Sequence, residues 1–202
     1  MSPYTRRESG QAAPLYITAV TGLLFLALIF FAFGEADVKR NGAQSAADAS
    51  ALAAAKESRT LLGLELKVRV MDRAFYTEVF NAPYVGLPGC YKAISFAAQN
   101  DARIEPNGCN PLTGLDWGYK VKLRTNKAMS ANLVPGTEGK RAKATAAAIV
   151  EGHCKFIPNP IPTSPSIGEV VCTTGLTWVV SPQSLAIMPD MADLFSVRLV
   201  ED

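Results

Sequence analysis

Candidate catalytic residues are few in this chain, and the clearest pair is His153 beside Cys154. A cysteine–histidine nucleophile needs a free thiolate and a partner that orients the imidazole, and we expect instead a disulfide-bonded Cys154 next to a solvent-facing ring. The stretch PGTEGK at 135–140 resembles a phosphate-binding loop, but it lacks the four-residue spacing and the following serine or threonine. The sequence therefore predicts no catalytic residue, no cofactor and no enzyme activity.

Four cysteines, Cys90, Cys109, Cys154 and Cys172, all follow a long apolar run. No C-x-x-C pair occurs and the chain has one histidine, so no metal site is predicted. An even cysteine count in a segment outside the cytoplasm is typical of disulfides. Three connectivities are open. We favour Cys90–Cys109 and Cys154–Cys172, because neighbouring cysteines close short loops that each stabilise the fold by about 3 kcal/mol. The alternative is four buried free thiols.

The apolar run extends from Ala12 to Phe33 without a charged residue. As a helix it is ~33 Å long, enough for a hydrocarbon core of ~30 Å. We therefore predict a transmembrane helix at 12–34. Ala32-Phe33-Gly34 is a weak small-x-small cleavage site, so a cleaved signal peptide is the alternative to a retained signal anchor.

The charges that flank this span bear on its direction. Arg6 and Arg7 precede it, which favours a cytoplasmic N-terminus at 1–11. Lys39 and Arg40 follow the span and weaken this bias, and the four cysteines decide for an extracytoplasmic C-terminal part. Glu35 and Asp37 are expected to mark the lipid–water boundary, with pairing to a basic partner helix as the alternative.

The span continues into an alanine-rich helical extension at 35–60, and we expect one helix from about Pro14 to about Arg59. Small residues recur on one face of it at steps of four, three and four. They let helix backbones approach closely, so we predict a helix-association face, in which Asp48 is the polar contact residue. The alternative is that alanine is there only as a good helix former. The small residues of this face are Ala43, Ala47, Ser50 and Ala54.

Residues 61–202 are expected to form an extracytoplasmic α+β head, with an antiparallel sheet packed against the base of the long helix. Tyr119, Val121 and Leu123 alternate with basic residues, which is typical of a half-buried strand. The alanines of 140–152 fit a helix or a strand, and we favour a strand. The expected elements are a strand-like alternation at 62–70, a helix at 72–80, a disulfide-stapled loop at 86–111, strands at 118–126 and 140–152, an irregular proline-rich loop at 156–168, and strands at 169–180 (with a turn at Thr174-Gly175) and 194–202.

Twenty basic and 18 acidic residues give a formal net charge of +2. Nucleic-acid binding needs a concentrated basic surface, so this overall balance argues against nucleic acid as a partner.

The N-terminal quarter resembles TadE/TadG-like proteins of tight-adherence (Flp, type IVc) pilus systems. The shared pattern is a basic start, Gly-Gln-Ala-Ala, the apolar span, a charged exit and the block QSAADASALAAA at 44–55. The GQAAP form at 10–14 is most similar to the actinobacterial branch. The resemblance implies a pilin-like outline and, as partners, the membrane and other pilin-like subunits or assembly proteins of the Tad system.

One departure concerns processing. Prepilin peptidases of these systems cut after a glycine, and the typical substrate has glutamate at the fifth following residue. Here Gly10-Gln11 would be the cut site, but Leu15 stands at the glutamate position. The resemblance then implies an uncut, membrane-resident assembly factor rather than a filament subunit.

Two functions follow. The first is a non-enzymatic, single-pass, pseudopilin-like component of Tad/Flp pilus assembly that forms hetero- or homo-oligomers through its N-terminal helix. The second is a membrane-tethered module whose head binds a cell-wall or extracellular ligand.

Overall fold

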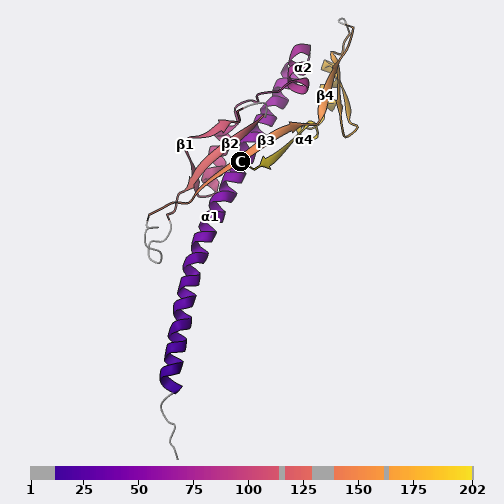
Figure 1. Ribbon diagram of the computed structural model, residues 1–202. Coiled ribbons are helices and arrows are strands. Elements are labelled where there is room, and N and C mark those ends of the chain that lie inside the picture. Colours follow the sequence, from indigo (N-terminus) through magenta and orange to yellow (C-terminus); the bar gives the residue numbers. More distant parts are fainter. Residues whose placement is uncertain (1–11, 114–116, 129–138, 162–163, 202) are drawn as a thin grey trace, which may run out of the picture.

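One helix, α1, extends from Ala12 to Val68 and carries every other element at its C-terminal half (Figure 1). This computed structural model describes residues 12–113, 117–128, 139–161 and 164–201, without the side chains of 12, 32, 33, 35 and 36. At ~1.5 Å per residue, the 57 residues of α1 make a rod of roughly 86 Å. The expected α+β arrangement of a long N-terminal helix followed by antiparallel sheets is confirmed.

The alternation at 62–70 was expected to be a strand, and this prediction is wrong: α1 continues through it to Val68. Every second position is apolar there, so every fourth is too. Leu62, Leu66 and Val70 therefore also share a helical face, and all three are buried. A run of alternating leucines satisfies both periods, and packing beneath α1 selects the helix.

Helix α2, Arg73–Asn81, confirms the helix expected at 72–80. Asp72 caps it by accepting a hydrogen bond from the Phe75 N–H at 3.0 Å, and Arg69 donates to the same carboxylate. The Phe75 N–H, followed by the Arg69 guanidinium, lowers the pKa of Asp72. The cap therefore fixes the sharp turn between α1 and α2.

A four-stranded antiparallel sheet packs against α1 in the order β1-β2-β3-β7. Its inner face buries Tyr119, Val121 and Leu123 of β2, as their alternation predicted. The strands expected at 118–126, 140–152 and 194–202 are confirmed. The bounds are β1 Ala102–Pro111, β2 Gly118–Thr125, β3 Lys143–Gly152 and β7 Phe195–Val200.

The region 86–111, expected to be mainly a stapled loop, instead contains helix α3, Cys90–Gln99, and strand β1. Helix α3 buries Ala93 and Ala97, which lie one turn apart. Glycine and proline residues suggested a loop here. They interrupt β1 but do not prevent the strand from forming. The register with β2 shifts between Ile104 and Cys109, a stretch that holds Pro106 and Gly108.

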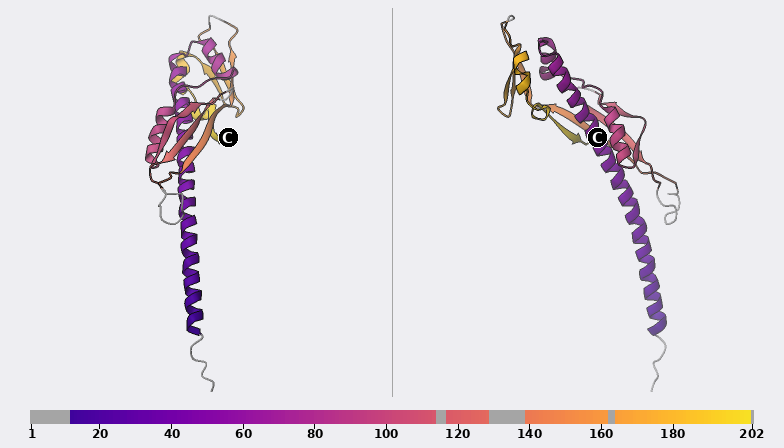
Figure 2. Two further views of the ribbon diagram at one scale, coloured as in Figure 1. Left: turned by 60° about the vertical axis from the view of Figure 1, so that its left-hand side comes forward. Right: turned by 180° about the vertical axis from the view of Figure 1, so that it is seen from behind.

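A second, three-stranded antiparallel sheet projects from the far end of the head (Figure 2). The irregular loop expected at 156–168 begins later than predicted, because β4 continues to Pro158. The turn at Thr174-Gly175 is confirmed, with Gly175 at φ 87°. This sheet consists of β4 Cys154–Pro158, β5 Gly168–Cys172 and β6 Thr177–Val180, and it is followed by η1 Pro182–Ile187 and α4 Met191–Leu194.

Two disulfides hold the ends of the head. Cys90–Cys109 joins α3 to β1, and Cys154–Cys172 joins facing residues of β4 and β5. These are the two pairs that the short-loop argument favoured. Each closes a short loop, with separations of 19 and 18 residues.

We predict that non-reducing peptide mapping of the purified chain recovers only the peptides Cys90–Cys109 and Cys154–Cys172. Replacing either pair by alanines should lower the free energy of unfolding by about 3 kcal/mol, because the unfolded chain regains the entropy of an open loop. Denaturant titration in detergent measures this change. A peptide linking Cys109 to Cys154, or an unchanged unfolding midpoint in both double variants, would contradict the prediction.

Candidate functional site

The N-terminal half of α1 exposes a continuous apolar surface. Ala13–Phe31 is long and apolar enough to cross a membrane, and nothing in the described chain covers it. Phe30 is 82% exposed, a state that costs free energy in water. The Thr18 and Thr21 hydroxyls donate to carbonyls of the preceding turn, Thr21 to Ile17 at 2.7 Å. The two threonine hydroxyls of this segment are thus satisfied within the helix, as a hydrocarbon environment requires.

The small-residue face (Ala43, Ala47, Ser50 and Ala54) lies farther along α1 and is completely buried within the chain itself. At this level α1 packs mainly against β3 and α3. The Ser50 hydroxyl is satisfied by the Ala46 carbonyl at 2.7 Å. The small-residue face was expected to receive a neighbouring subunit. The structure corrects this, because the head of the same chain already occupies the face.

Small side chains allow α1 to pack this closely against the rest of the head. Ala144, Ala146 and Ala148 of β3 face the same helix, so small side chains lie on both sides of the contact. The backbone of Gly89, before α3, also comes near: a Cβ there would lie 2.0 Å from the Ala54 carbonyl oxygen. A leucine on either side would separate the layers.

Asp48, expected to be a contact residue for a partner, has a role inside the chain. Its carboxylate accepts a hydrogen bond from Gln44 Nε2 at 2.8 Å, and the same amide donates to the Thr145 carbonyl at 3.2 Å. Asp48 thus orients Gln44 toward β3. Among the hydrogen bonds of the described residues, this pair is the first polar contact between helix and head when α1 is followed from its apolar end.

Deeper in the head, Ser58 and Arg59 of α1 hold two other segments, the start of β2 with the residue before it and the start of β7, and the sequence did not indicate these contacts. Ser58 is fully buried and accepts hydrogen bonds from Trp117 Nε1 at 2.9 Å and from the Tyr119 hydroxyl at 3.4 Å. Arg59 donates to the Phe195 carbonyl at 2.9 Å, and burial lowers the pKa of its guanidinium. In the sequence Ser58 and Arg59 lie within the polar run KESRT at 56–60, and nothing distinguishes them from the exposed residues of that run.

The residues considered for chemistry are not brought together. Cys154 is in a disulfide, and the backbone of His153 bonds to Leu194 and Thr173. Among the described residues, no group of three histidine, cysteine, aspartate or glutamate side chains could hold a metal ion. Gly10, Gln11 and most of the 135–140 stretch lie outside the described residues, as does the Glu35 side chain.

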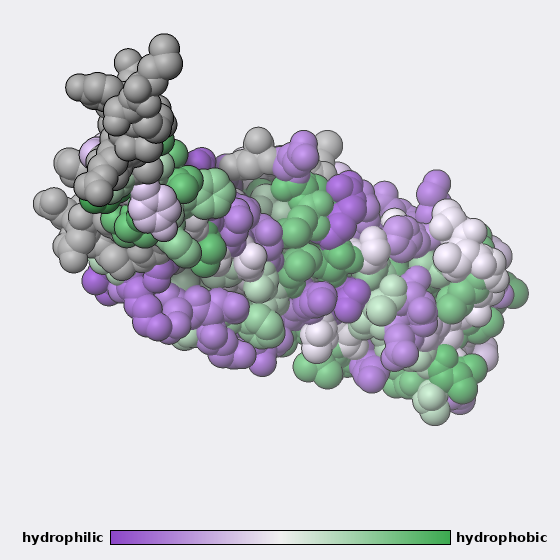
Figure 3. All heavy atoms as spheres, turned by 90° about the horizontal axis from the view of Figure 1, so that it is seen from below, coloured by the Kyte–Doolittle hydropathy of each residue, from purple (hydrophilic) through white to green (hydrophobic). Residues whose placement is uncertain are grey.

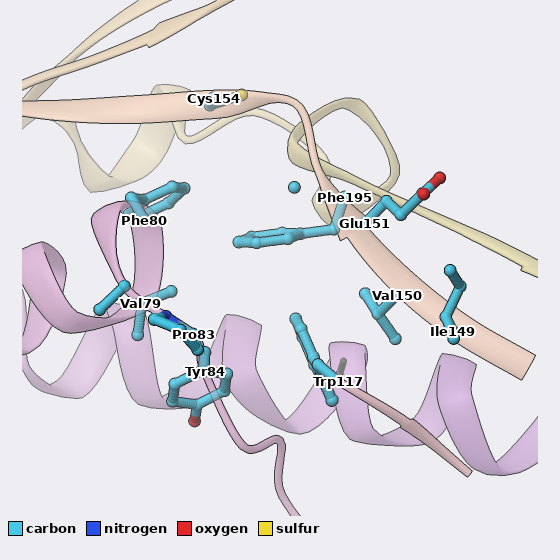
Figure 4. Close-up of a pocket in the computed structure, with 12 residues that line it drawn as sticks. Val79, Phe80, Pro83, Tyr84, Trp117, Ile149, Val150, Glu151, Cys154 and Phe195 are labelled. Carbon is cyan, nitrogen blue, oxygen red and sulfur yellow. The ribbon is translucent and has the colours of Figure 1, made fainter. Parts of the chain in front are cut away.

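A cavity of about 260 Å³ lies between α2, β3 and β7, and aromatic rings form much of its wall (Figure 4). The Phe195 ring lies between Phe80 and Trp117, with ring centroids 5.4 Å from each. Tyr84 meets Trp117 edge-on at 5.3 Å. Burial, aided by the charges of nearby glutamates, raises the pKa of Tyr84 to about 12, so its phenol is neutral at physiological pH.

The rim of this cavity carries one carboxylate, Glu151, which points away from the rings (Figure 4). Arg198 donates two hydrogen bonds to it, at 2.7 and 2.8 Å, and these bonds lower the pKa of Glu151. The exposed lining of the aromatic cavity is more polar than apolar, so it suits a small ligand that combines polar atoms with an apolar face.

Comparison with known proteins identifies one segment. Residues 10–57 match the family described as putative Flp pilus-assembly TadE/G-like. The resemblance drawn from the sequence is thus confirmed over the apolar surface and the small-residue face, while the actinobacterial type stays a prediction. Searches of curated proteins and of solved structures found no match. The matched family is one of pilus-assembly components and not of enzymes, and the match supports a role in pilus assembly with other components of that system.

We predict that Ala47→Leu destabilises the head. Overpacking of a close helix–sheet contact costs about 1–3 kcal/mol, so the unfolding midpoint in detergent should fall by several degrees. Ser45→Leu, two residues away on an exposed position of the same helix, is the matched control and should leave the midpoint within a degree. An Ala47→Leu chain as stable as the control would mean that this face is not packed as described.

Proposed function

We propose that this protein is a non-enzymatic, single-pass component of Tad/Flp pilus assembly with a pseudopilin-like build. Its span would occupy 12–34, with residues 1–11 in the cytoplasm and the head outside. The observation that carries the proposal is the division of one unbroken helix. Ala13–Phe31 is exposed and apolar, one face of the part from Ala43 onward is buried by the head, and the family match covers the first part and the beginning of the second.

The geometry gives this helix two functions. Its apolar end holds the chain in a bilayer, where exposure of residues such as Phe30 is favourable. Its other end is the centre of the head's core. Since α1 runs from one to the other without a break, the head has no flexible linker of its own, and its orientation follows that of the span.

Two observations support the direction of insertion. The four cysteines are paired in disulfides, which persist in oxidising compartments outside the cytoplasm. Arg6 and Arg7 precede the span, as is typical of a cytoplasmic flank.

Association with other subunits would use the part of α1 that the head leaves uncovered. Gly22, Gly34 and Gly42 have open space around the position of a Cβ, so a second helix could approach the backbone closely there. The proposed contact therefore precedes the small-residue face along α1, whereas the sequence had led us to expect the contact on that face. The partners would be pilin-like subunits or assembly proteins of the same system.

We predict that Gly42→Leu reduces association without unfolding the head. A photo-crosslinking residue at Val38, which is 70% exposed, should give adducts with other pilus-system proteins in cells, and Gly42→Leu should reduce their yield at least several-fold. The unfolding midpoint should not change, because nothing lies within 4 Å of the added Cβ. Lys56→Leu, an exposed position of α1 within the head, is the matched control and should leave the adduct yield unchanged. Adducts that are insensitive to Gly42→Leu would exclude this surface.

The same cells test the topology. A new cysteine at Ser95, on the exposed side of α3, should react with a membrane-impermeant maleimide in intact cells. A cysteine at Ser2 should react only after permeabilisation. The reverse pattern would overturn the orientation.

A second function, recognition of a cell-wall or extracellular ligand by the head, is favoured by the aromatic cavity. Its four rings would stack on an apolar face of a small ligand. We predict that cell-wall fragments quench the Trp117 fluorescence in a saturable way. Tyr84→Ala should weaken this binding at least tenfold, and Tyr91→Ala, an exposed tyrosine of α3, should not. Absence of saturable quenching would remove this candidate.

A further inference from the structure

Basic side chains gather on the outer face of the four-stranded sheet. Arg103 and Arg124 face each other across β1 and β2, and Arg124 faces Lys143 across β2 and β3. Their outward direction follows from the burial of their neighbours on the inner face, Leu123 among them. With two further residues they form what we term the basic cluster. The basic cluster consists of Arg103, Lys122, Arg124, Arg141 and Lys143.

This cluster has an excess of positive charge. Among the described residues, Glu105 is paired within the cluster with Lys143 at 2.8 Å and also feels the charges of Arg124 and Lys122, while Asp101 at the same end of the sheet pairs with Lys127. The neighbouring cations lower the pKa of Arg103, which reports mutual repulsion. The Nε of Arg124 is buried without a hydrogen-bond partner. Concentrated like charge of this kind is costly unless something anionic lies nearby.

The basic cluster lies at the end of the sheet that is nearest the span. Following α1 from its apolar end, Gln44 contacts Thr145, close to the cluster. Ser58, farther along α1, contacts Trp117 and Tyr119 at the opposite end of β2. The β2–β3 end therefore points back along α1 toward its N-terminal end, as both ribbon views show (Figures 1 and 2). Figure 3 shows the molecule from that side, where hydrophilic and hydrophobic patches are both exposed on the surface.

The distances bring this end close to a bilayer surface. Gln44 follows Phe31 by 13 residues, or ~20 Å of helix. From Thr145 back to Arg141 the strand covers at most about 13 Å. At least about 7 Å is then left beyond Arg141 and about 13 Å beyond Lys143 and the arginines level with it, while Lys122 faces Thr145 and lies farther away. Extended basic side chains and a headgroup layer of roughly 5–8 Å on each side of the hydrocarbon core together span much of this gap. The ordinary tilt of a transmembrane helix, about 20°, can shorten the remaining gap on the side of the sheet.

From this placement we propose that the basic cluster docks the head on anionic phospholipid headgroups of the membrane that its own span crosses. The inference rests on the proposed membrane anchoring and adds a second, electrostatic contact to it. Lipid is favoured over an acidic partner protein because the span holds the cluster permanently beside the headgroups, at a high effective concentration. Since α1 is unbroken, docking selects the direction in which the rod tilts and so fixes the orientation of the head relative to the membrane plane.

The test uses the full chain in nanodiscs of neutral phosphatidylcholine, either alone or with about 30% of the anionic lipid phosphatidylglycerol. A donor dye on a new cysteine at Asn126, beside the cluster, reports its distance to acceptor-labelled headgroups by energy transfer. The native cysteines are paired and do not compete for the label. We expect higher transfer in anionic discs, and loss of this gain at about 1 M salt, where the screening length is ~3 Å.

The variant Arg103→Gln, Lys122→Gln, Arg141→Gln should lower the ratio of docked to undocked heads on the order of 100-fold, and so return the transfer to its value in neutral discs. The matched control replaces three basic residues elsewhere on the chain, Lys67→Gln, Arg73→Gln and Lys155→Gln, and should behave like the original chain.

Equal transfer in the two kinds of disc, or equal effects of the cluster and control variants, would overturn the proposal. So would a cluster variant that keeps its orientation on lipid but loses cross-linking to a pilus-system protein, which would assign the cluster to an acidic protein. Co-elution with neutral discs measures anchoring separately. A chain that fails to enter any disc refutes the proposed function, whereas one that enters both and docks on neither refutes only this inference.

Discussion

Close packing between a small-residue face of α1 and an alanine-rich strand is the contact on which the rest of the structure depends. Each buried alanine contributes little by itself, since a methyl group removes only a small apolar area from water. The value of small side chains lies in distance: they let the helix lie directly on β3, with the backbone before α3 touching it from another side. The larger residues of the core, such as Tyr76, Tyr119 and Phe156, are then placed around a fixed axis.

The polar contacts of the helix reinforce the same axis at two levels. Gln44 bonds to the sheet where α1 enters the head. Farther along α1, Ser58 bonds to Trp117 just before β2, and Arg59 bonds to Phe195 at the start of β7. An apolar segment of membrane-spanning length and the centre of the folded head are thus parts of one continuous helix. In the proposed membrane anchoring, the height and orientation of the head would both follow from the length and tilt of this single helix.

The small second sheet depends on different forces. It has few residues and packs on α2 through an aromatic group in which Tyr76 contacts both Phe156 and Trp178. Asn81 adds a side-chain amide that pairs with both backbone groups of Phe156. The Cys154–Cys172 disulfide then closes the hairpin. The aromatic cavity lies at the boundary between this part and the main sheet, a position where two packed units meet incompletely.

Much of the fold was predictable from local pattern. The charge-free run could only be a span or a buried helix, the alternation in GYKVKLRT predicted β2, and the cysteine spacing favoured the two observed pairs. Boundaries failed where one pattern satisfied two periods, as at 62–70, or where glycine and proline made a bulge instead of a loop, as in β1.

By itself the sequence determined that a membrane-length apolar helix leads into a small-residue helix and a disulfide-stapled α+β head, because these features follow from composition and spacing along the chain. Only the tertiary structure decided what covers the small-residue face. A small side chain specifies close approach but not the identity of the neighbour, and here the neighbour is strand β3 of the same chain. The basic cluster was likewise decided only by the tertiary structure. Its residues come from three strands and from the loop before one of them, and strand register brings them together although the sequence keeps them apart.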